Sequence, residues 1–284
     1  MKMKIKGHET FTIREGWLEK GLAEVNKNSK VFTKNYGADA LGVGSNMAKS
    51  IRYWLKAGEF AEEVQKVGAE LTDIGEIIYE KDPYLEDIFS LWIFHINLAW
   101  NKEYATSWYM FFNEINIEDF SKEELVGQLM EKLQTVYGVE SVPERSVRDD
   151  VSALINMYVK ERIEEYDPEE KRISPFTKLG LIKKGIAGYQ KAQPSSSDLS
   201  DKAVFYAMQR YMKEKEKDSA GIDELLNAPL SPGKILNLNR LAINEYIDNL
   251  AMKELVTVNR TAGLDMVYMR NEMSLQVIVE DYYK

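Results

Sequence analysis

The side chains that could do chemistry in this sequence gather between residues 41 and 56, where basic and short polar residues interrupt an apolar pattern. Lysine and arginine pair with phosphate groups, and serine, asparagine and tyrosine reach phosphates or base edges. This mixture of side chains predicts contact with a nucleic acid. The residues predicted to make that contact are Ser45, Asn46, Lys49, Ser50, Arg52, Tyr53 and Lys56.

An amphipathic helix must position these side chains. At about 100° per residue, Met47, Ile51, Trp54 and Leu55 form an apolar stripe, and the polar and basic residues point away from it. Ser45 is placed to cap the helix. The alternative is an ordinary amphipathic helix whose basic face is only solvated.

The flanking residues predict a winged helix-turn-helix around this helix. Gly42 and Gly44 permit a tight entry, and residues 71–78 fit the short strand and closing helix that follow a wing. We also expect a first helix over 13–25 and a short strand over 30–32.

Charge is unevenly distributed along the 284 residues, whose net charge is -9. Residues 1–58 hold 11 Lys or Arg against 5 Asp or Glu, whereas residues 59–145 hold 6 against 19. A basic segment on an acidic body presents one face to a polyanion and repels it elsewhere. We therefore predict local, salt-sensitive binding of duplex DNA.

The composition excludes several classes of protein. The chain has no cysteine, which removes disulfides, thiolate metal sites and cysteine nucleophiles. The basic start lacks the apolar core of a secretory signal, and the most apolar run, 91–100, is too short to span a bilayer. These features predict a cytoplasmic protein without a membrane partner.

Helical patterns dominate, so we predict a mainly α fold with small β-hairpins and tandem winged helix-turn-helix-like units. The predicted divisions are a basic winged-helix-like unit with aromatic core helices at 1–115, an acidic helical unit at 116–192 and a winged-helix-like unit at 199–284. The last two are separated by a Ser-rich linker at 193–198.

Within the acidic unit, Ser121 and Glu124 predict a capping box, and Ser146 predicts the start of a helix with Asp149 and Asp150 in its first turn. In the last unit, residues 231–233 predict a turn. There the long helix 240–254 carries Glu245, Asp248 and Asn249, which favours protein docking over groove reading.

No catalytic, metal or cofactor site is predicted. His8 and His95 lack metal-ligand spacing and fit core histidines better. Glu169 and Lys171 resemble the end of a nuclease motif but fall in a charge run without a strand to display them.

Several motifs spread over nearly the whole chain resemble a bacterial domain-of-unknown-function family, number four-thousand-and-seven. They are Gly7-His8-Glu9-Thr10-Phe11, Arg14-Glu15-Gly16-Trp17-Leu18, Leu41-Gly42-Val43-Gly44, Ile51-Arg52-Tyr53-Trp54, Asp82-Pro83-Tyr84-Leu85-Glu86-Asp87 with Leu91-Trp92 and His95, Ala105-Thr106-Ser107-Trp108-Tyr109 with Phe112-Asn113, Ser231-Pro232-Gly233 and Thr261-Ala262-Gly263. The resemblance implies genes near sulfur-transfer enzymes in DNA phosphorothioate-modification and phage-defence clusters. It implies no catalytic residues.

Together these features predict a non-enzymatic DNA-binding protein, a transcription regulator or recruitment subunit of a DNA-modification or phage-defence system. Two alternatives stay open. One is a scaffold that binds the protein subunits of such a system, and the other is a DNA-processing enzyme with an unrecognised site.

Overall fold

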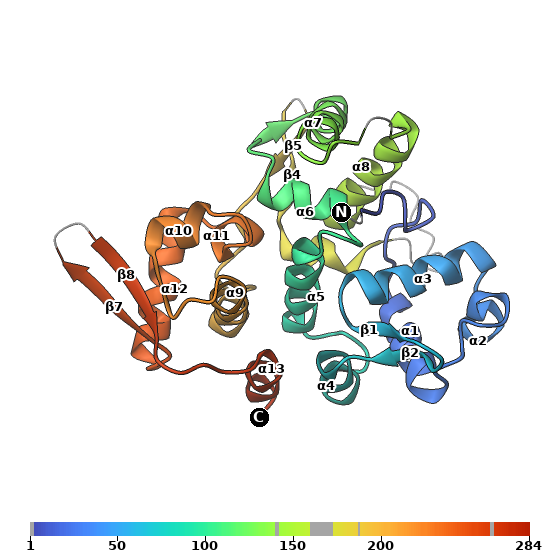
Figure 1. Cartoon of the computed structure of the whole chain (residues 1–284), viewed down its shortest axis with the longest axis horizontal. Coiled ribbons are helices and arrows are strands. Elements are labelled where there is room, and N and C mark those ends of the chain that lie inside the picture. The colour runs from blue at the N-terminus through green and yellow to red at the C-terminus, as the bar shows by residue number, and fades with distance from the viewer. Residues whose placement is uncertain (1–2, 140–141, 160–172, 187, 262–263) are drawn as a thin grey trace. The chain divides into compact units, whose positions relative to one another are not determined.

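The computed structural model describes residues 3–139, 142–159, 173–186, 188–261 and 264–284. The chain forms two compact units, Met1–Ala192 and Gln193–Lys284 (Figure 1). Whether 1–115 and 116–192 fold separately within the first unit, as the sequence predicts, stays a prediction.

The amino-terminal part of the first unit is helical with one hairpin. Its elements are α1 (Trp17–Lys27), the 3-10 turn η1 (Asn35–Gly37), α2 (Ala38–Leu41), α3 (Ser45–Ala57), β1 (Ala61–Val64), β2 (Gly68–Leu71) and α4 (Asp73–Lys81). β1 and β2 pair antiparallel, with Ala61 opposite Leu71. The strand predicted over 30–32 is wrong, because these residues form turns that are closed by backbone hydrogen bonds.

The aromatic segment predicted as a core is buried. It forms α5 (Ile88–Trp100) and α6 (Thr106–Asn113). Asp87 caps α5 by accepting a hydrogen bond from the amide of Phe89. Trp92 and Trp108 are fully enclosed, so the two helices form the interior on which the basic amino-terminal part packs.

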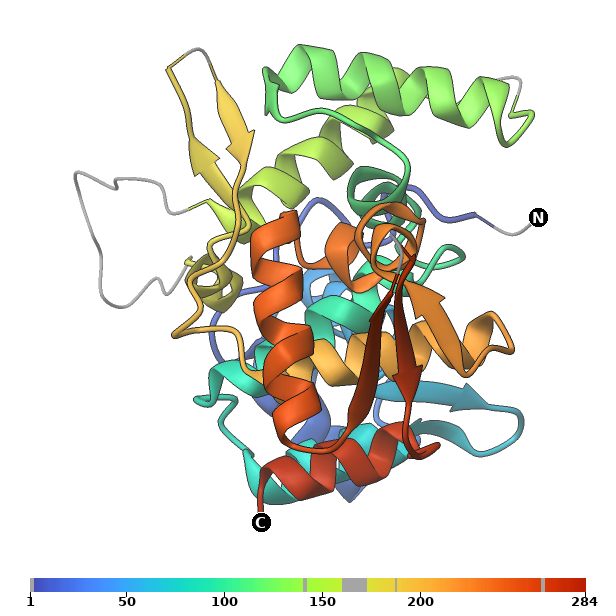
Figure 2. The same cartoon turned by 90° about the vertical axis from the view of Figure 1, so that its left-hand side faces the viewer.

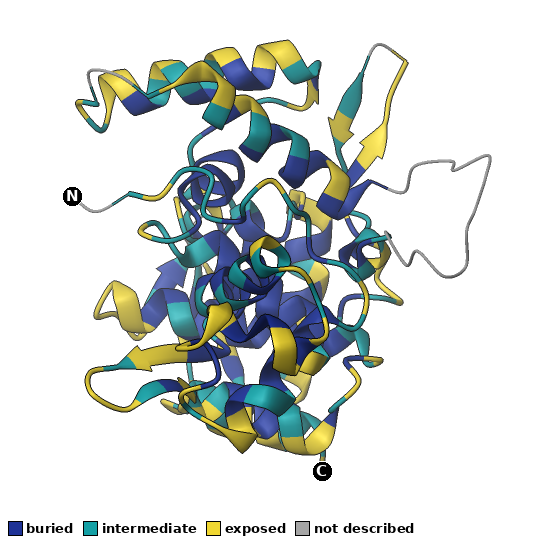
Figure 3. Ribbon diagram, turned by 90° about the vertical axis from the view of Figure 1, so that its right-hand side faces the viewer, coloured by how far each residue is buried: buried dark blue, intermediate teal, exposed yellow. Residues whose placement is uncertain are grey.

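The predicted capping box of Ser121 and Glu124 is present at the start of α7 (Lys122–Thr135). The next helix, α8 (Glu144–Tyr158), begins two residues before the predicted Ser146. The remaining elements of the first unit are β3 (Asp119–Phe120), η2 (Pro175–Leu179), β4 (Ile182–Lys184) and β5 (Tyr189–Lys191), and the sheet order is β3-β5-β4. Figure 3 shows the inner helices coloured as buried and the outer turns as exposed.

The second unit contains α9 (Asp201–Glu214), β6 (Ser219–Gly221), α10 (Ile222–Asn227), α11 (Pro232–Ile235), α12 (Arg240–Met252), β7 (Val256–Thr261), β8 (Leu264–Met269) and α13 (Leu275–Tyr282). Its strands form an antiparallel sheet in the order β6-β8-β7. Figure 2 shows α12 beside the β7–β8 hairpin. The turn predicted at 231–233 is instead the start of α11, because Ser231 caps a short helix that opens with Pro232.

The fold is therefore mainly helical with small antiparallel sheets, as predicted. Among the described residues, no helix is both long and apolar enough to cross a membrane.

Candidate nucleic-acid interface

Helix α3 spans the residues predicted to contact nucleic acid. Its amino-terminal cap is Gly44, which has no side chain to offer, so the prediction that Ser45 caps the helix is wrong. Ser45 is the first helical residue, and its hydroxyl donates to Asn35 Oδ1 at 2.9 Å. This bond ties the helix to the preceding turn η1.

The apolar side of α3 is buried as predicted. Ile51, Trp54 and Leu55 are almost wholly enclosed, and Met47 is half-buried. Trp54 Nε1 donates to the carbonyl of Phe11 at 3.2 Å, which fixes the helix to the chain that precedes α1.

Two residues predicted on the accessible side of α3 are buried instead. Ser50 is fully enclosed and Tyr53 is 6% exposed, so neither can reach a base edge. For Tyr53 the cause is an amino-terminal arm, residues 3–12, which packs against its ring. A Cβ added to Gly7 of the arm would collide with the Tyr53 ring, so only glycine permits this approach.

Tyr53 is also fixed at its polar end. Its hydroxyl donates to the carbonyl of Tyr104 at 2.8 Å. Burial, and secondarily the charge of Asp150, raises the pKa of Tyr53 well above its ordinary value. The phenol therefore stays neutral and serves as a packing group.

The basic residues of α3 stay accessible around a surface hollow of about 320 Å³, called the basic hollow below. Asn46 is exposed at the start of the helix and accepts a hydrogen bond from Lys49. The residues that line the hollow are Lys4, Gly7, Glu9, Tyr36, Lys49, Arg52, Tyr53, Lys56, Glu63 and Tyr104.

Three lysines of the basic hollow lie over tyrosine rings. Lys49 Nζ is 4.6 Å from the centre of the Tyr36 ring, and Lys56 Nζ is 4.6 Å from that of Tyr104. Lys4 Nζ is 5.4 Å from the Tyr53 ring. Within the described chain, no carboxylate lies within salt-bridge distance of these ammonium groups. The three ammonium groups are therefore available to an incoming anion.

Arg52 differs from the lysines because its guanidinium is paired. It lies 2.7 Å from Glu63 on β1, and both side chains are partly exposed. The pair joins α3 to the hairpin. Arg52 therefore contributes little net charge to the hollow.

Lys4 was missed by the sequence analysis, although the lysine-rich start of the chain was a signal for it. The arm brings it to α3 through several anchors. The Lys4 amide donates to Thr106 Oγ1 at 3.0 Å, and Lys6 Nζ lies 2.7 Å from Asp149. The Lys6 amide donates to Asp150 at 2.7 Å.

Asp150 is the buried centre of these anchors. His8 Nε2 lies 2.9 Å from its Oδ1, and the Ser107 hydroxyl donates to its Oδ2 at 2.5 Å. His8, Ser107 and Asp150 are at most 1% exposed. The prediction that Asp149 and Asp150 serve the first turn of their helix is wrong, since α8 begins at Glu144 and both acids hold the arm.

Both histidines lie in the core, as predicted. His8 stacks on Trp54 with ring centres 5.6 Å apart, and His95 Nδ1 lies 2.8 Å from the Tyr158 hydroxyl. Among the described residues, no three His, Cys, Asp or Glu side chains lie close enough together to hold a metal ion. The motif of Glu169 and Lys171 lies outside the described residues.

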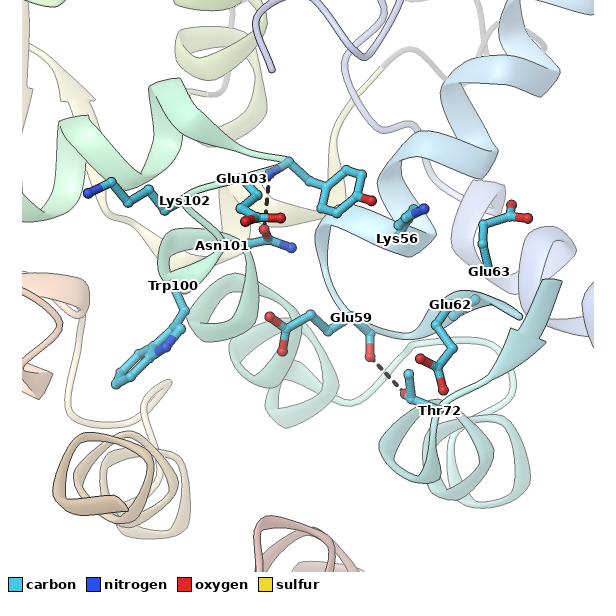
Figure 4. Close-up of a pocket in the computed structure, with 11 residues that line it drawn as sticks. Lys56, Glu59, Glu62, Glu63, Thr72, Trp100, Asn101, Lys102 and Glu103 are labelled. Carbon is cyan, nitrogen blue, oxygen red and sulfur yellow. Dashed lines mark hydrogen bonds between the residues drawn. The ribbon is translucent and has the colours of Figure 1, made fainter. Parts of the chain in front are cut away.

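A second hollow of about 600 Å³, called the acidic hollow below, adjoins the basic one and shares Lys56, Glu63 and Tyr104 with it (Figure 4). Its carboxylates come from Glu59, Glu62, Glu63 and Glu103. The Thr72 hydroxyl and the Tyr104 amide make the two bonds drawn in the figure, to the Glu59 carbonyl and to Asn101. These four carboxylates outnumber the two cations of the lining, Lys56 and Lys102. The acidic hollow therefore has a net negative charge and repels a polyanion.

The long helix of the second unit is exposed along an acidic stripe. Leu241, Glu245, Asp248 and Met252 recur every three or four residues, and all four are exposed. The stripe has apolar ends and an acidic middle. Arg260, on the neighbouring strand β7, is bonded to Asp248 and Asn244.

Comparisons with known proteins agree with the family resemblance. The family model described as "Protein of unknown function (DUF4007)" matches residues 5–283. No curated protein matches the chain.

Two solved structures share the fold of this chain. One, described as "Magnesium ion-bound SspB crystal structure", is 23% identical with a TM-score of 0.87, and the match covers 99% of this chain and 88% of that chain. Another, described as "SspB crystal structure", is 24% identical with a TM-score of 0.85 and the same coverage. The magnesium ion named in the first description belongs to that protein.

Proposed function

The chain belongs to the family of proteins of unknown function DUF4007, and we propose that it binds DNA through the basic hollow as a cytoplasmic, non-catalytic regulator or recruitment subunit of a bacterial DNA-modification or phage-defence system. The observation that carries the proposal is the set of Lys4, Lys49 and Lys56. These lysines converge on one hollow without acidic partners in the described chain.

Unpaired ammonium groups favour phosphate because binding releases the counterions condensed on the nucleic acid. Lysines that rest on tyrosine rings, without an ion pair to break, can turn toward a phosphate. The basic hollow is therefore suited to bind the DNA backbone.

The acidic hollow supports a directional approach. It begins at Lys56 and Tyr104, where the basic hollow ends, and its carboxylates repel the backbone. DNA bound at Lys49 and Lys4 must therefore leave the surface on the side away from Glu62 and Glu103.

The order of elements supports a winged-helix interpretation of both units. The second unit runs helix, strand, three helices, hairpin and a last helix, and its first strand pairs with the last one in the order β6-β8-β7. The first unit runs α1, α2, α3 and then the β1–β2 hairpin, and Ala69 of β2 donates to the carbonyl of Ser29. Under this proposal the basic side of α3 faces DNA.

A DNA phosphorothioate-modification system is the setting we propose. The family resemblance implies it, and both similar structures carry the name SspB. The exposed stripe of α12 favours a protein subunit as a second partner, because its acids are poorly suited to a DNA groove.

The test is a salt titration of duplex binding by the full chain. Lys49→Glu with Lys56→Glu should weaken binding and lower the slope of log affinity against log salt by roughly 2, as expected for two lost phosphate contacts. The matched control reverses two exposed lysines on β4, Lys183→Glu with Lys184→Glu. Equal affinities for wild type and the α3 variant, with unchanged melting, would refute the proposal.

The alternative function is DNA processing. The description of one similar structure as magnesium-bound favours it, because Mg²⁺ commonly serves phosphate chemistry. Incubation of the protein with supercoiled plasmid and Mg²⁺ distinguishes a DNA-processing enzyme from a protein that only binds DNA. Conversion to open circles, absent from a heat-inactivated sample, would replace the binding role with a catalytic one.

A further inference from the structure

We infer that Tyr36 and Lys49 hold one unpaired nucleotide, with its base stacked on the tyrosine ring and its phosphate on the lysine. The inference rests on the proposed DNA-binding function and specifies the form of DNA that the hollow takes. It makes an unpaired or extruded nucleotide the preferred ligand, in place of an intact duplex groove.

The backbone at Tyr36 is held in an uncommon conformation. Asn35, Tyr36 and Gly37 have φ values of 46°, 56° and 82°, so three consecutive residues lie in the left-handed region. Only glycine adopts this region without a steric penalty, and a bulky residue there is an outlier that often marks a functional site. The bond from Ser45 to Asn35 holds this turn against the start of α3.

This turn presents Tyr36 to the solvent. The side chain is 44% exposed and lines the basic hollow, whereas the other two tyrosines of the hollow are more enclosed. An exposed aromatic ring on a strained turn adds little buried surface to the hydrophobic core. The Lys49 ammonium lies over this ring, and when it turns away to a phosphate it leaves an aromatic face for a base, as in single-strand-binding proteins.

Two of the side chains that were predicted to read a paired duplex are not available on α3. Ser50 and Tyr53 are buried, and Asn46 is bonded to Lys49. Bases in an intact duplex are stacked on each other and cannot present a face to Tyr36. A base that has left the stack can present its face to the Tyr36 ring.

The ligands that test this inference are three labelled DNAs of one sequence: a paired duplex, the same duplex with one unpaired central nucleotide, and the single strand. Anisotropy titrations of the full chain should show at least tenfold tighter binding of the bulged duplex than of the paired duplex. Tyr36→Ala should abolish this difference, so that the variant binds the paired and the bulged duplex with equal affinity. Tyr36→Phe, which keeps the ring, should retain the preference.

Tyr84→Ala is the matched control, because Tyr84 is 66% exposed and lines a different hollow of the same unit. This variant should bind all three DNAs with the same affinities as the wild type. Equal wild-type affinity for paired and bulged duplexes would overturn the inference and leave DNA binding standing, as would an equal loss on all three DNAs in Tyr36→Ala. Failure of the wild type to bind any of the three would refute the proposed function itself.

Discussion

Arg260 on β7 lies 2.7 Å from the carboxylate of Asp248 on α12, so the hairpin of the second unit turns its cation onto its own helix. Both side chains are about half exposed, and the pair contributes little stability. Its effect is on the charge of the hairpin, because this cation is already matched by an acid.

We therefore expect Arg260→Ala to change DNA affinity of the full chain by no more than about 1 kcal/mol, the scale of one exposed charged contact. Asp248→Ala should raise affinity slightly, since it frees Arg260 and removes an acid from the face of α12. A competition titration on one duplex compares both with wild type. A loss of several kcal/mol in Arg260→Ala would assign DNA binding to the second unit.

A second prediction concerns the acidic hollow. Glu62→Lys with Glu103→Lys should increase non-specific DNA affinity and steepen the salt dependence by up to about 2, because each new lysine adds a phosphate contact next to Lys56. Glu131→Lys with Glu216→Lys makes the same charge change at exposed positions outside both hollows. Equal gains in the two double variants would show that net charge, and not the position of the hollow, controls binding.

A third prediction concerns the buried anchor of the arm. Asp150→Ala leaves His8, Ser107 and the Lys6 amide without their shared acceptor, and each unpaired buried group costs about 1–3 kcal/mol. We expect the free energy of unfolding in denaturant to fall by at least about 3 kcal/mol. Lys6→Ala removes only the half-exposed pair with Asp149 and should cost less than about 1 kcal/mol.

Tyr53 gives a prediction for alkaline pH. Its raised pKa means that the folded state favours the neutral phenol, so this stabilisation is complete below the ordinary value of 10.0 and is lost as pH rises above it. Tyr53→Phe should lower stability at neutral pH by about 1 kcal/mol through loss of the bond to Tyr104. Above pH 10 its unfolding free energy should fall less steeply than that of wild type, by up to about 1.4 kcal/mol per pH unit. Parallel curves would contradict this role.

The segment between the two units gives a fifth prediction. Gln193, Ser195, Ser196 and Ser197 are exposed between β5 and α9. Limited proteolysis should cut there first and leave a fragment of about residues 1–192 that melts cooperatively. Protection of this segment would show that the two units share a core.

The sequence was sufficient to predict α3 and its apolar stripe, because Ile51, Trp54 and Leu55 repeat with the period of a helix. The capping box at Ser121 followed from a local rule that needs no tertiary structure. The burial of Ser50 and Tyr53 could not be predicted in the same way. Periodicity divides a helix into sides, but it does not show that a distant arm covers one of them.

Which residues line the basic hollow depends on contacts between residues that are far apart in sequence. Lys4 reaches it through Thr106 and Asp150, and Tyr36 reaches it through a left-handed turn that has no propensity signal. The three-to-four-residue spacing of Lys49, Arg52 and Lys56 was visible, whereas the neutralisation of Arg52 by Glu63 required the hairpin in place. Local sequence patterns therefore predicted the residues that α3 contributes to the hollow. The residues contributed by other segments, Lys4 and Tyr36, could be identified only from the tertiary structure.

The bond between the Lys6 amide and Asp150 spans 144 residues of sequence. During synthesis the arm is translated well before its anchor, which follows 144 residues later. Contacts of such high sequence separation form slowly, because a long loop must close before they can contribute. A nascent chain therefore carries its lysines before the basic hollow is assembled, and the DNA binding proposed above requires that α8 has been made and has docked.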